Sequence, residues 1–101
     1  MQWLWDKDGN KFRIEDETWS HIQEFHPEIT RIELIESVLL DPDVIVRSNW
    51  DAQSILYYKQ IRPNRYRVVV VQTVESRIKT TLTTDKIKRG EVVWAKEKPT
   101  H

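Results

Sequence analysis

The chain has 101 residues, a formal net charge of zero and no cysteine. This length suits a single domain, and the lack of thiols excludes disulfides and thiolate metal sites. The sequence has no apolar run near the roughly 18 residues needed to span a bilayer, and its first residues lack the basic segment of a secretion signal. We therefore expect one domain over residues 1–101, in the cytoplasm and with no membrane partner.

The two ends of the chain carry opposite charge. Residues 1–45 contain eleven acidic and four basic side chains, whereas residues 46–101 contain five acidic and twelve basic ones. This asymmetry suggests a basic surface that faces an anion. It is equally compatible with acidic helices that pack beside a basic sheet, and the sequence leaves both interpretations open.

The N-terminal part predicts a small hairpin and two helices. The apolar stretches 2–5 and 11–14 flank Asp8-Gly9-Asn10, which favours a tight turn. Acidic residues 15–17 then suit the first turn of a helix that ends near Phe25. A second helix is expected from Pro27 to about Leu40, because apolar residues recur at helical spacing there.

The rest of the chain predicts strands. Four valines in a row at positions 68–71 are typical of a central strand that is apolar on both faces. The expected strands are 44–47, 54–61, 65–73, 78–83 and 91–96. Helices followed by strands indicate an α+β fold, with two N-terminal helices packed on a four- to five-stranded antiparallel sheet and a short N-terminal hairpin.

The predicted sheet is rich in basic and hydroxyl side chains. Alternation along a strand places Arg65 and Arg67 on one face, and Tyr57 and Lys59 likewise share a face. Guanidinium groups bind phosphate in a bidentate manner, and tyrosine can stack on a base. Each such residue alone is also typical of a solvated strand. The expected nucleic-acid-binding residues are Arg65, Arg67, Lys79 and Thr84.

Two histidines near the first helix could transfer protons. Histidine is the natural general acid or base near pH 7, and RNA supplies its own nucleophile, the 2′-hydroxyl. His21 or His26 with cationic support would therefore suffice without a metal or cofactor. Alternatively, His26 caps a helix before Pro27, and His21 is a solvated or packed helix residue.

Several short motifs carry a family resemblance when read in chain order. They are Trp19-Ser20-His21-Ile22, His26-Pro27-Glu28, Leu39-Leu40-Asp41-Pro42-Asp43, Tyr57-Tyr58-Lys59, Ile78-Lys79-Thr80-Thr81 and Lys86-Ile87-Lys88-Arg89-Gly90. In this order they resemble the phage-associated branch of the barnase–EndoU–colicin–RelE (BECR) ribonuclease superfamily, over nearly the whole chain.

The resemblance implies a metal-independent endoribonuclease that cleaves RNA through 2′-hydroxyl attack. It implies a toxin, phage or mobile-element context, with RNA as substrate and an antitoxin or immunity protein as a further partner. By position it assigns catalytic roles to His21, His26, Arg47, Tyr58, Lys59 and Thr80. These residues should meet around one phosphate-sized hollow.

Two other functions fit the same residues. The basic face of the sheet could bind RNA or an acidic protein without cutting anything. An exposed sheet edge could instead pair with a partner strand in a structural protein. RNA that is bound but left intact would select the first of these alternatives, and a concentration-dependent mass would favour the second.

Overall fold

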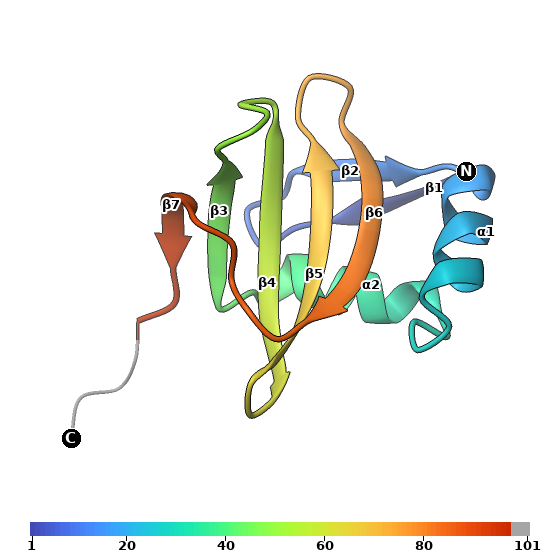
Figure 1. The fold of residues 1–101 in the computed structure, drawn as a ribbon. Coiled ribbons are helices and arrows are strands. Elements are labelled where there is room, and N and C mark those ends of the chain that lie inside the picture. The colour runs from blue at the N-terminus through green and yellow to red at the C-terminus, as the bar shows by residue number, and fades with distance from the viewer. Residues whose placement is uncertain (98–101) are drawn as a thin grey trace.

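The computed structural model describes residues 1–97, with two helices and seven strands (Figure 1). The elements are β1 (Gln2–Trp5), β2 (Lys11–Ile14), α1 (Asp16–Phe25), α2 (Ile32–Leu40), β3 (Val44–Ser48), β4 (Ser54–Arg62), β5 (Arg65–Gln72), β6 (Arg77–Thr84) and β7 (Gly90–Ala95). None of the helices in this part of the chain is long and apolar enough to cross a membrane.

All seven strands belong to one mixed sheet, in the order β1-β2-β6-β5-β4-β3-β7. The expectation of a four- to five-stranded antiparallel sheet is therefore wrong. The N-terminal hairpin joins the sheet, because β2 runs parallel to β6 and the Arg13 amide donates to the Ser76 carbonyl over 2.8 Å. At the other edge, β7 returns to pair with β3 rather than with β6.

The second helix begins at Ile32, five residues later than predicted from Pro27. The His26 amide closes α1 by donating to the Ile22 carbonyl over 2.7 Å, and the Ile29 amide donates to the His26 carbonyl over 2.9 Å. Residues 26–31 therefore form a loop that is tied to the end of α1. Ile29 is fully buried, so this loop contributes to the core although it is not helical.

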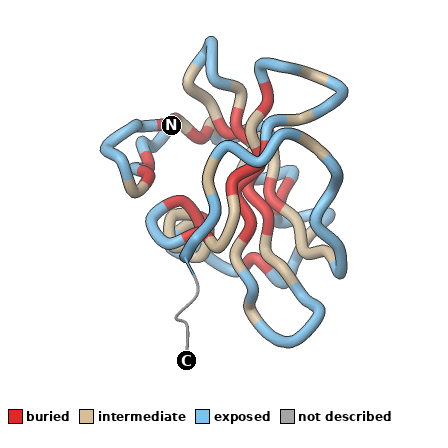
Figure 2. Tube along the Cα trace, turned by 90° about the vertical axis from the view of Figure 1, so that its left-hand side faces the viewer, coloured by how far each residue is buried: buried red, intermediate tan, exposed pale blue. Residues whose placement is uncertain are grey.

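The sheet has an apolar core on each of its faces. The inner face is the one covered by α1, α2 and the β1–β2 hairpin, and its core includes Ile22, Ile35, Tyr57 and Val69. The outer face is crossed by the connection between β6 and β7, as Figure 1 shows, and its smaller core is Val46, Leu56, Tyr58 and Val68. Figure 2 shows the buried residues concentrated in the strands between these layers.

A buried carboxylate fixes the N-terminal hairpin on the sheet. Asp6 is only 4 % exposed, and its Oδ2 accepts a hydrogen bond from the Tyr57 hydroxyl over 2.7 Å. The Asp8 and Asn10 amides donate to Oδ1, and the Asn10 side chain donates to Oδ2. Burial acts to raise the pKa of Asp6, but these hydrogen bonds outweigh burial and hold the pKa below its ordinary value.

Candidate phosphate-binding site

Three polar side chains form a row across the inner face of the sheet. Lys59 of β4 pairs in register with Arg67 of β5, which pairs in turn with Thr83 of β6. Because directly opposed residues project to the same side of a sheet, all three point toward the layer that contains α1 and its following loop.

A hollow of about 300 Å³ opens at the end of this row. We call it the arginine hollow, and it is lined by Glu28, Ile61, Arg62, Arg65, Arg67 and Thr83. Glu28 comes from the 26–31 loop, and its Oε2 accepts a hydrogen bond from the Thr83 hydroxyl over 2.9 Å. Arg62 is the last residue of β4, and Arg65 and Arg67 belong to β5; the tight turn that joins these strands contains Asn64, which has a φ of 59°. Three arginines and one carboxylate leave the hollow with an excess of positive charge.

Arg67 is the distinctive residue of the arginine hollow. Its Nε is buried and has no hydrogen-bond partner among residues 1–97. Burial lowers the pKa of Arg67, and attraction to Glu28 opposes this effect only in part. Arginine nevertheless stays protonated in proteins. The hollow is therefore lined by a partly desolvated cation with an unused donor, which suits an anion that can accept several hydrogen bonds, such as a phosphate.

A histidine, His26, lies beside the arginine hollow. The Nδ1 atom of His26 is 3.9 Å from the Glu28 Oε2 atom, and the His26 side chain is half-buried. The side chain of Glu28 is itself positioned by Thr83. His26, Glu28 and Thr83 thus form a chain of polar groups that leads from the end of α1 into the sheet.

Lys59 faces the same side as Arg67, but its ammonium is paired with a carboxylate that Lys96 also contacts. Its ammonium donates to Asp41 Oδ2 over 2.9 Å and to the Asp41 carbonyl over 3.0 Å, and Lys96 donates to Asp41 Oδ1 over 2.9 Å. The hydrogen bonds from Lys59 and Lys96 lower the pKa of Asp41 to about 2. Lys59 therefore links β4 to the end of α2, and its ammonium contacts Asp41 rather than lining the arginine hollow.

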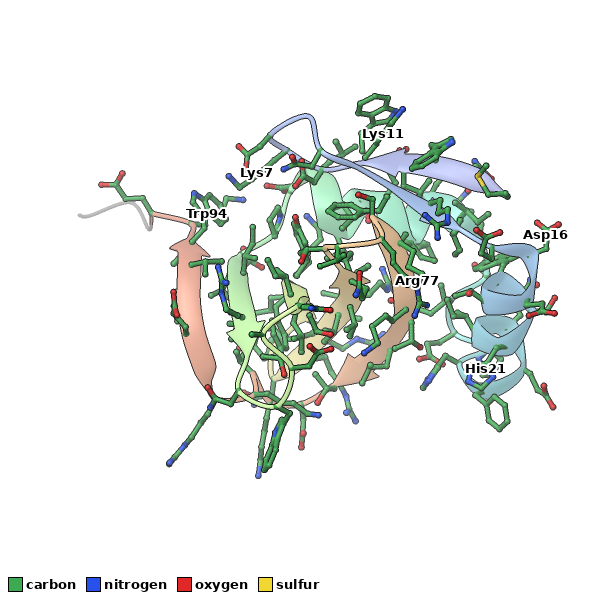
Figure 3. All side chains as sticks on the ribbon, turned by 90° about the horizontal axis from the view of Figure 1, so that it is seen from above. Lys7, Lys11, Asp16, His21, Arg77 and Trp94 are labelled. Carbon is green, nitrogen blue, oxygen red and sulfur yellow. The ribbon has the colours of Figure 1, made fainter. Side chains whose placement is uncertain are left out.

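The structure does not bring His21 or Arg47 to the arginine hollow. His21 is exposed on α1, where its ring lies 4.6 Å from that of Phe25 (Figure 3). Arg47 is exposed near the opposite end of the sheet, in register with Ile55. Ile55 precedes Lys59 by four residues on β4, which is roughly 13 Å at the rise of a strand.

The remaining predicted residues of the sheet belong to the outer face. Thr80 and Thr84 are in register with Val70 and Tyr66, which alternate with the inward-facing Arg67 and Val69. Tyr58 is buried in the outer core, and its hydroxyl accepts a hydrogen bond from the Lys88 amide over 3.0 Å. Lys79 contacts Ser54 Oγ at 3.3 Å. The predicted set is thus divided between two faces, and only His26, Lys59, Arg65 and Arg67 lie in or beside the arginine hollow.

Three polar lining residues of the arginine hollow, and the apolar Ile61, were not among the predicted ones. Arg62 lies at the end of β4, where a register shift after Gln60 changes the alternation of side chains. Thr83 could have been predicted only from the register in which β6 pairs with β5, because this register places Thr83 opposite Arg67. Glu28 follows His26 by two residues, and this proximity was the one local signal for it.

Among residues 1–97, no three histidine, aspartate or glutamate side chains are grouped so that they could hold a metal ion. No family model, curated protein or solved structure matches the chain. The functional interpretation therefore depends on the geometry of the arginine hollow.

Proposed function

We propose that this protein is an RNA-directed phosphodiesterase, a metal-independent endoribonuclease whose site is the arginine hollow. The observation that carries the proposal is the buried, unpaired Nε of Arg67 beside Arg62 and Arg65. A phosphodiester group carries a negative charge and several acceptor oxygens. It would therefore pair with the Arg67 guanidinium, whose Nε has no acceptor among residues 1–97. Arg62 and Arg65, at the exposed end of the hollow, would contact the neighbouring phosphates.

The chemical step needs few protein groups, because the nucleophile belongs to RNA. In the proposed step the 2′-oxygen forms a bond to phosphorus while His26 takes the 2′-hydroxyl proton. The bond from phosphorus to the 5′-oxygen then breaks, and that oxygen takes a proton from water. The products are a 2′,3′-cyclic phosphate and a free 5′-hydroxyl.

Two further groups would support this step. Glu28, held by Thr83, lies where its charge would stabilise the imidazolium that forms on His26. Arg67 would stabilise the charge that builds up on the phosphorane-like transition state. This assignment replaces His21 with His26 as the proton acceptor, since His21 lies outside the arginine hollow.

The alternative is a module that binds RNA at the same hollow without cutting it. One observation favours it: only one of the two histidines on the described part of α1 and its loop lies near the arginine hollow. Within residues 1–97, no second imidazole is therefore placed to protonate the leaving 5′-oxygen. For the cleaving form we further propose a cytoplasmic toxin or a phage or mobile-element protein, restrained by an antitoxin or immunity protein.

Incubation of an RNA oligonucleotide with the purified protein in EDTA tests the proposal. We expect cleavage, and we expect His26→Asn to slow it by about 100-fold or more, the lower range of general acid–base effects. His21→Asn is the matched control, since it changes an exposed histidine outside the arginine hollow. Loss of activity in His21→Asn with full activity in His26→Asn would overturn the assignment. RNA that binds but stays intact would select the non-catalytic module.

A further inference from the structure

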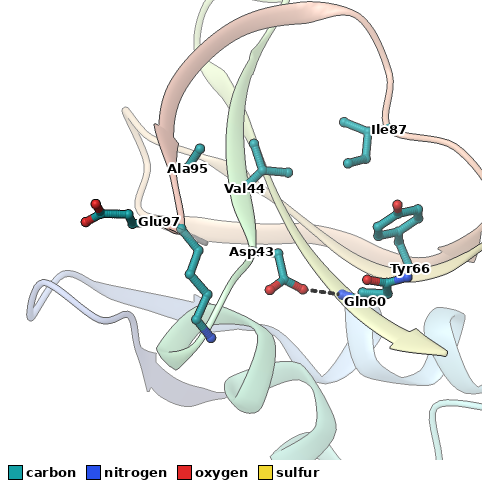
Figure 4. Close-up of a pocket in the computed structure, with 8 residues that line it drawn as sticks. Asp43, Val44, Gln60, Tyr66, Ile87, Ala95 and Glu97 are labelled. Atoms are coloured by element: carbon teal, nitrogen blue, oxygen red, sulfur yellow. Dashed lines mark hydrogen bonds between the residues drawn. The ribbon is translucent and has the colours of Figure 1, made fainter. Parts of the chain in front are cut away.

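A second pocket, of about 350 Å³, lies on the outer face of the sheet and has no part in the proposed cleavage (Figure 4). We call it the outer pocket. This volume falls within the usual range for small-molecule sites. Its lining residues are Asp43, Val44, Gln60, Tyr66, Ile87, Ala95, Lys96 and Glu97. In the close-up, Val44, Ile87 and Tyr66 surround an apolar space, and Asp43 and Gln60 lie together at one end of it.

The apolar walls of the outer pocket are held in place by Tyr58. The rings of Tyr58 and Tyr66 pack edge to face, with centroids 6.4 Å apart and an interplanar angle of 84°, which fixes the orientation of Tyr66. The Tyr58 hydroxyl also accepts the hydrogen bond from the Lys88 amide. This bond anchors the connection between β6 and β7 directly beside Ile87. Tyr58 thus positions two of the residues that line the pocket, Tyr66 and Ile87.

The polar end of the outer pocket is equally well fixed. The Asp43 amide donates to the Tyr58 carbonyl over 2.7 Å, and the Asp43 carbonyl accepts from the Lys96 amide over 2.8 Å. The Oδ2 atom of the Asp43 carboxylate accepts a hydrogen bond from the backbone amide of Gln60 over 2.7 Å. Asp43 Oδ1 has no hydrogen bond to any of residues 1–97 that are described. One carboxylate oxygen and the Gln60 side chain therefore remain able to bind a ligand.

We infer that the outer pocket binds a nucleobase. A flat ring would pack against the face of Tyr66 and beneath Ile87, while its N–H groups donate to Asp43. Among the four bases guanine fits best, because its Watson–Crick edge carries N1–H and the N2 amino group side by side, so that one can donate to the unused Oδ1 of Asp43 and the other to the second lone pair of Oδ2, which already accepts from Gln60. Gln60 could accept or donate at the rim. The choice of this ligand class rests on the proposed action on RNA.

The outer pocket and the arginine hollow flank the same pair of strands. Tyr66 and Arg67 are consecutive in β5, so their side chains project to opposite faces. A base in the outer pocket therefore cannot belong to the nucleotide whose phosphate is bound at Arg67. It belongs either to a distant nucleotide of an RNA whose backbone passes Arg62 and Arg65 at the turn, or to a free nucleotide.

Titration of the isotope-labelled protein with the four nucleoside 5′-monophosphates, followed by amide NMR shifts, tests this inference. The titration uses the Arg67→Met variant, so that the phosphate group does not report on the arginine hollow. We expect guanosine monophosphate to shift the amides of Gln60, Tyr66 and Ile87. Tyr66→Ala should weaken its binding by about five-fold or more, a low estimate for one base–aromatic stack. Asp43→Asn should remove the preference for guanine.

Tyr58→Phe provides a matched control for the architecture of the outer pocket. It keeps the ring that packs on Tyr66 but removes the acceptor of the Lys88 amide, so we expect weaker binding with an otherwise unchanged spectrum. If none of the four nucleotides at millimolar concentration shifts the amide signals of the outer pocket, the inference is overturned. Unchanged affinity in a folded Tyr66→Ala variant would do the same.

Two further experiments are needed. One distinguishes a base of the RNA from a free nucleotide, and the other distinguishes the ribonuclease proposal from the outer-pocket inference. Competition by a guanine-containing RNA oligonucleotide, but not by one without guanine, would indicate a base of the RNA; binding of the mononucleotide alone would indicate a free ligand. Nucleotide binding in a protein that leaves RNA intact would contradict the ribonuclease proposal and support the outer pocket. RNA cleavage without nucleotide binding would support the ribonuclease proposal and contradict the inference about the outer pocket.

Discussion

Replacement of Arg67 by methionine should stabilise the fold while it abolishes action on RNA. The wild-type protein keeps a buried guanidinium nitrogen without an acceptor, and an unsatisfied buried donor costs about 1–3 kcal/mol. Methionine has a similar length and no polar hydrogen. The variant loses the attraction between Arg67 and Glu28, which for a partly exposed pair is about 1 kcal/mol or less. The balance is a gain of roughly 1 kcal/mol, or about 4–8 °C in Tm for a domain of this size.

Thermal and urea unfolding followed by circular dichroism measures this balance, and RNA cleavage in EDTA measures the functional loss. Arg65→Met is the matched control for stability, because Arg65 is exposed and its replacement should change the free energy of unfolding by less than about 0.5 kcal/mol. An Arg67→Met variant that is destabilised by more than about 1 kcal/mol would refute the reasoning. In that case Arg67 would serve the fold rather than an anionic ligand.

Three further predictions concern the fold. Tyr57→Phe leaves the buried Asp6 without one donor and should lower the free energy of unfolding by about 1.5–3 kcal/mol, measured in urea. Gly90→Ala would place a Cβ in steric conflict with the Arg47 carbonyl oxygen, so we expect amide exchange in β7 to accelerate while exchange in β5 is unchanged. The pKa of Asp41 is lowered to about 2 and that of Asp6 is lowered as well, so both carboxylates stabilise the fold above about pH 4 and lose this effect in acid. For Asp41 the loss falls between about pH 4 and pH 2, and acid titration should show stability decreasing in that window.

Local sequence patterns predicted most of the individual elements. The valine run and the alternation around it correctly placed Val69 and Val71 on the face of the core, with Arg67 continuing it. Apolar spacing gave the first helix almost to the residue, since α1 covers Asp16–Phe25. These features depend on neighbours along the chain, which a sequence displays directly.

The arrangement of the sheet depends on contacts that no local pattern contains. The parallel contact between Arg13 and Arg77 joins residues 64 positions apart, and it converts the hairpin into two strands of the main sheet. Tyr58 and Thr80 lie on the opposite face of the sheet from Arg67, and this placement depends on the register of the strands. A register shift between Val70 and Val71 also alters the alternation of side chains in β6. Arg65 and Arg67 could therefore be proposed from the sequence as basic candidates. The residues that lie beside them in the arginine hollow could not.

We propose that the arginine hollow directs the cleavage of RNA through attack by the 2′-hydroxyl of the RNA itself. The most direct measurement is mass spectrometry of the ends produced from one RNA oligonucleotide, and from the same oligonucleotide with a single 2′-deoxy residue at the cut, incubated with the protein in EDTA. The account predicts 2′,3′-cyclic phosphate ends from the first and no cut at the modified position of the second. Cleavage that persists at the 2′-deoxy position, or that depends on His21 and not on His26, would contradict it.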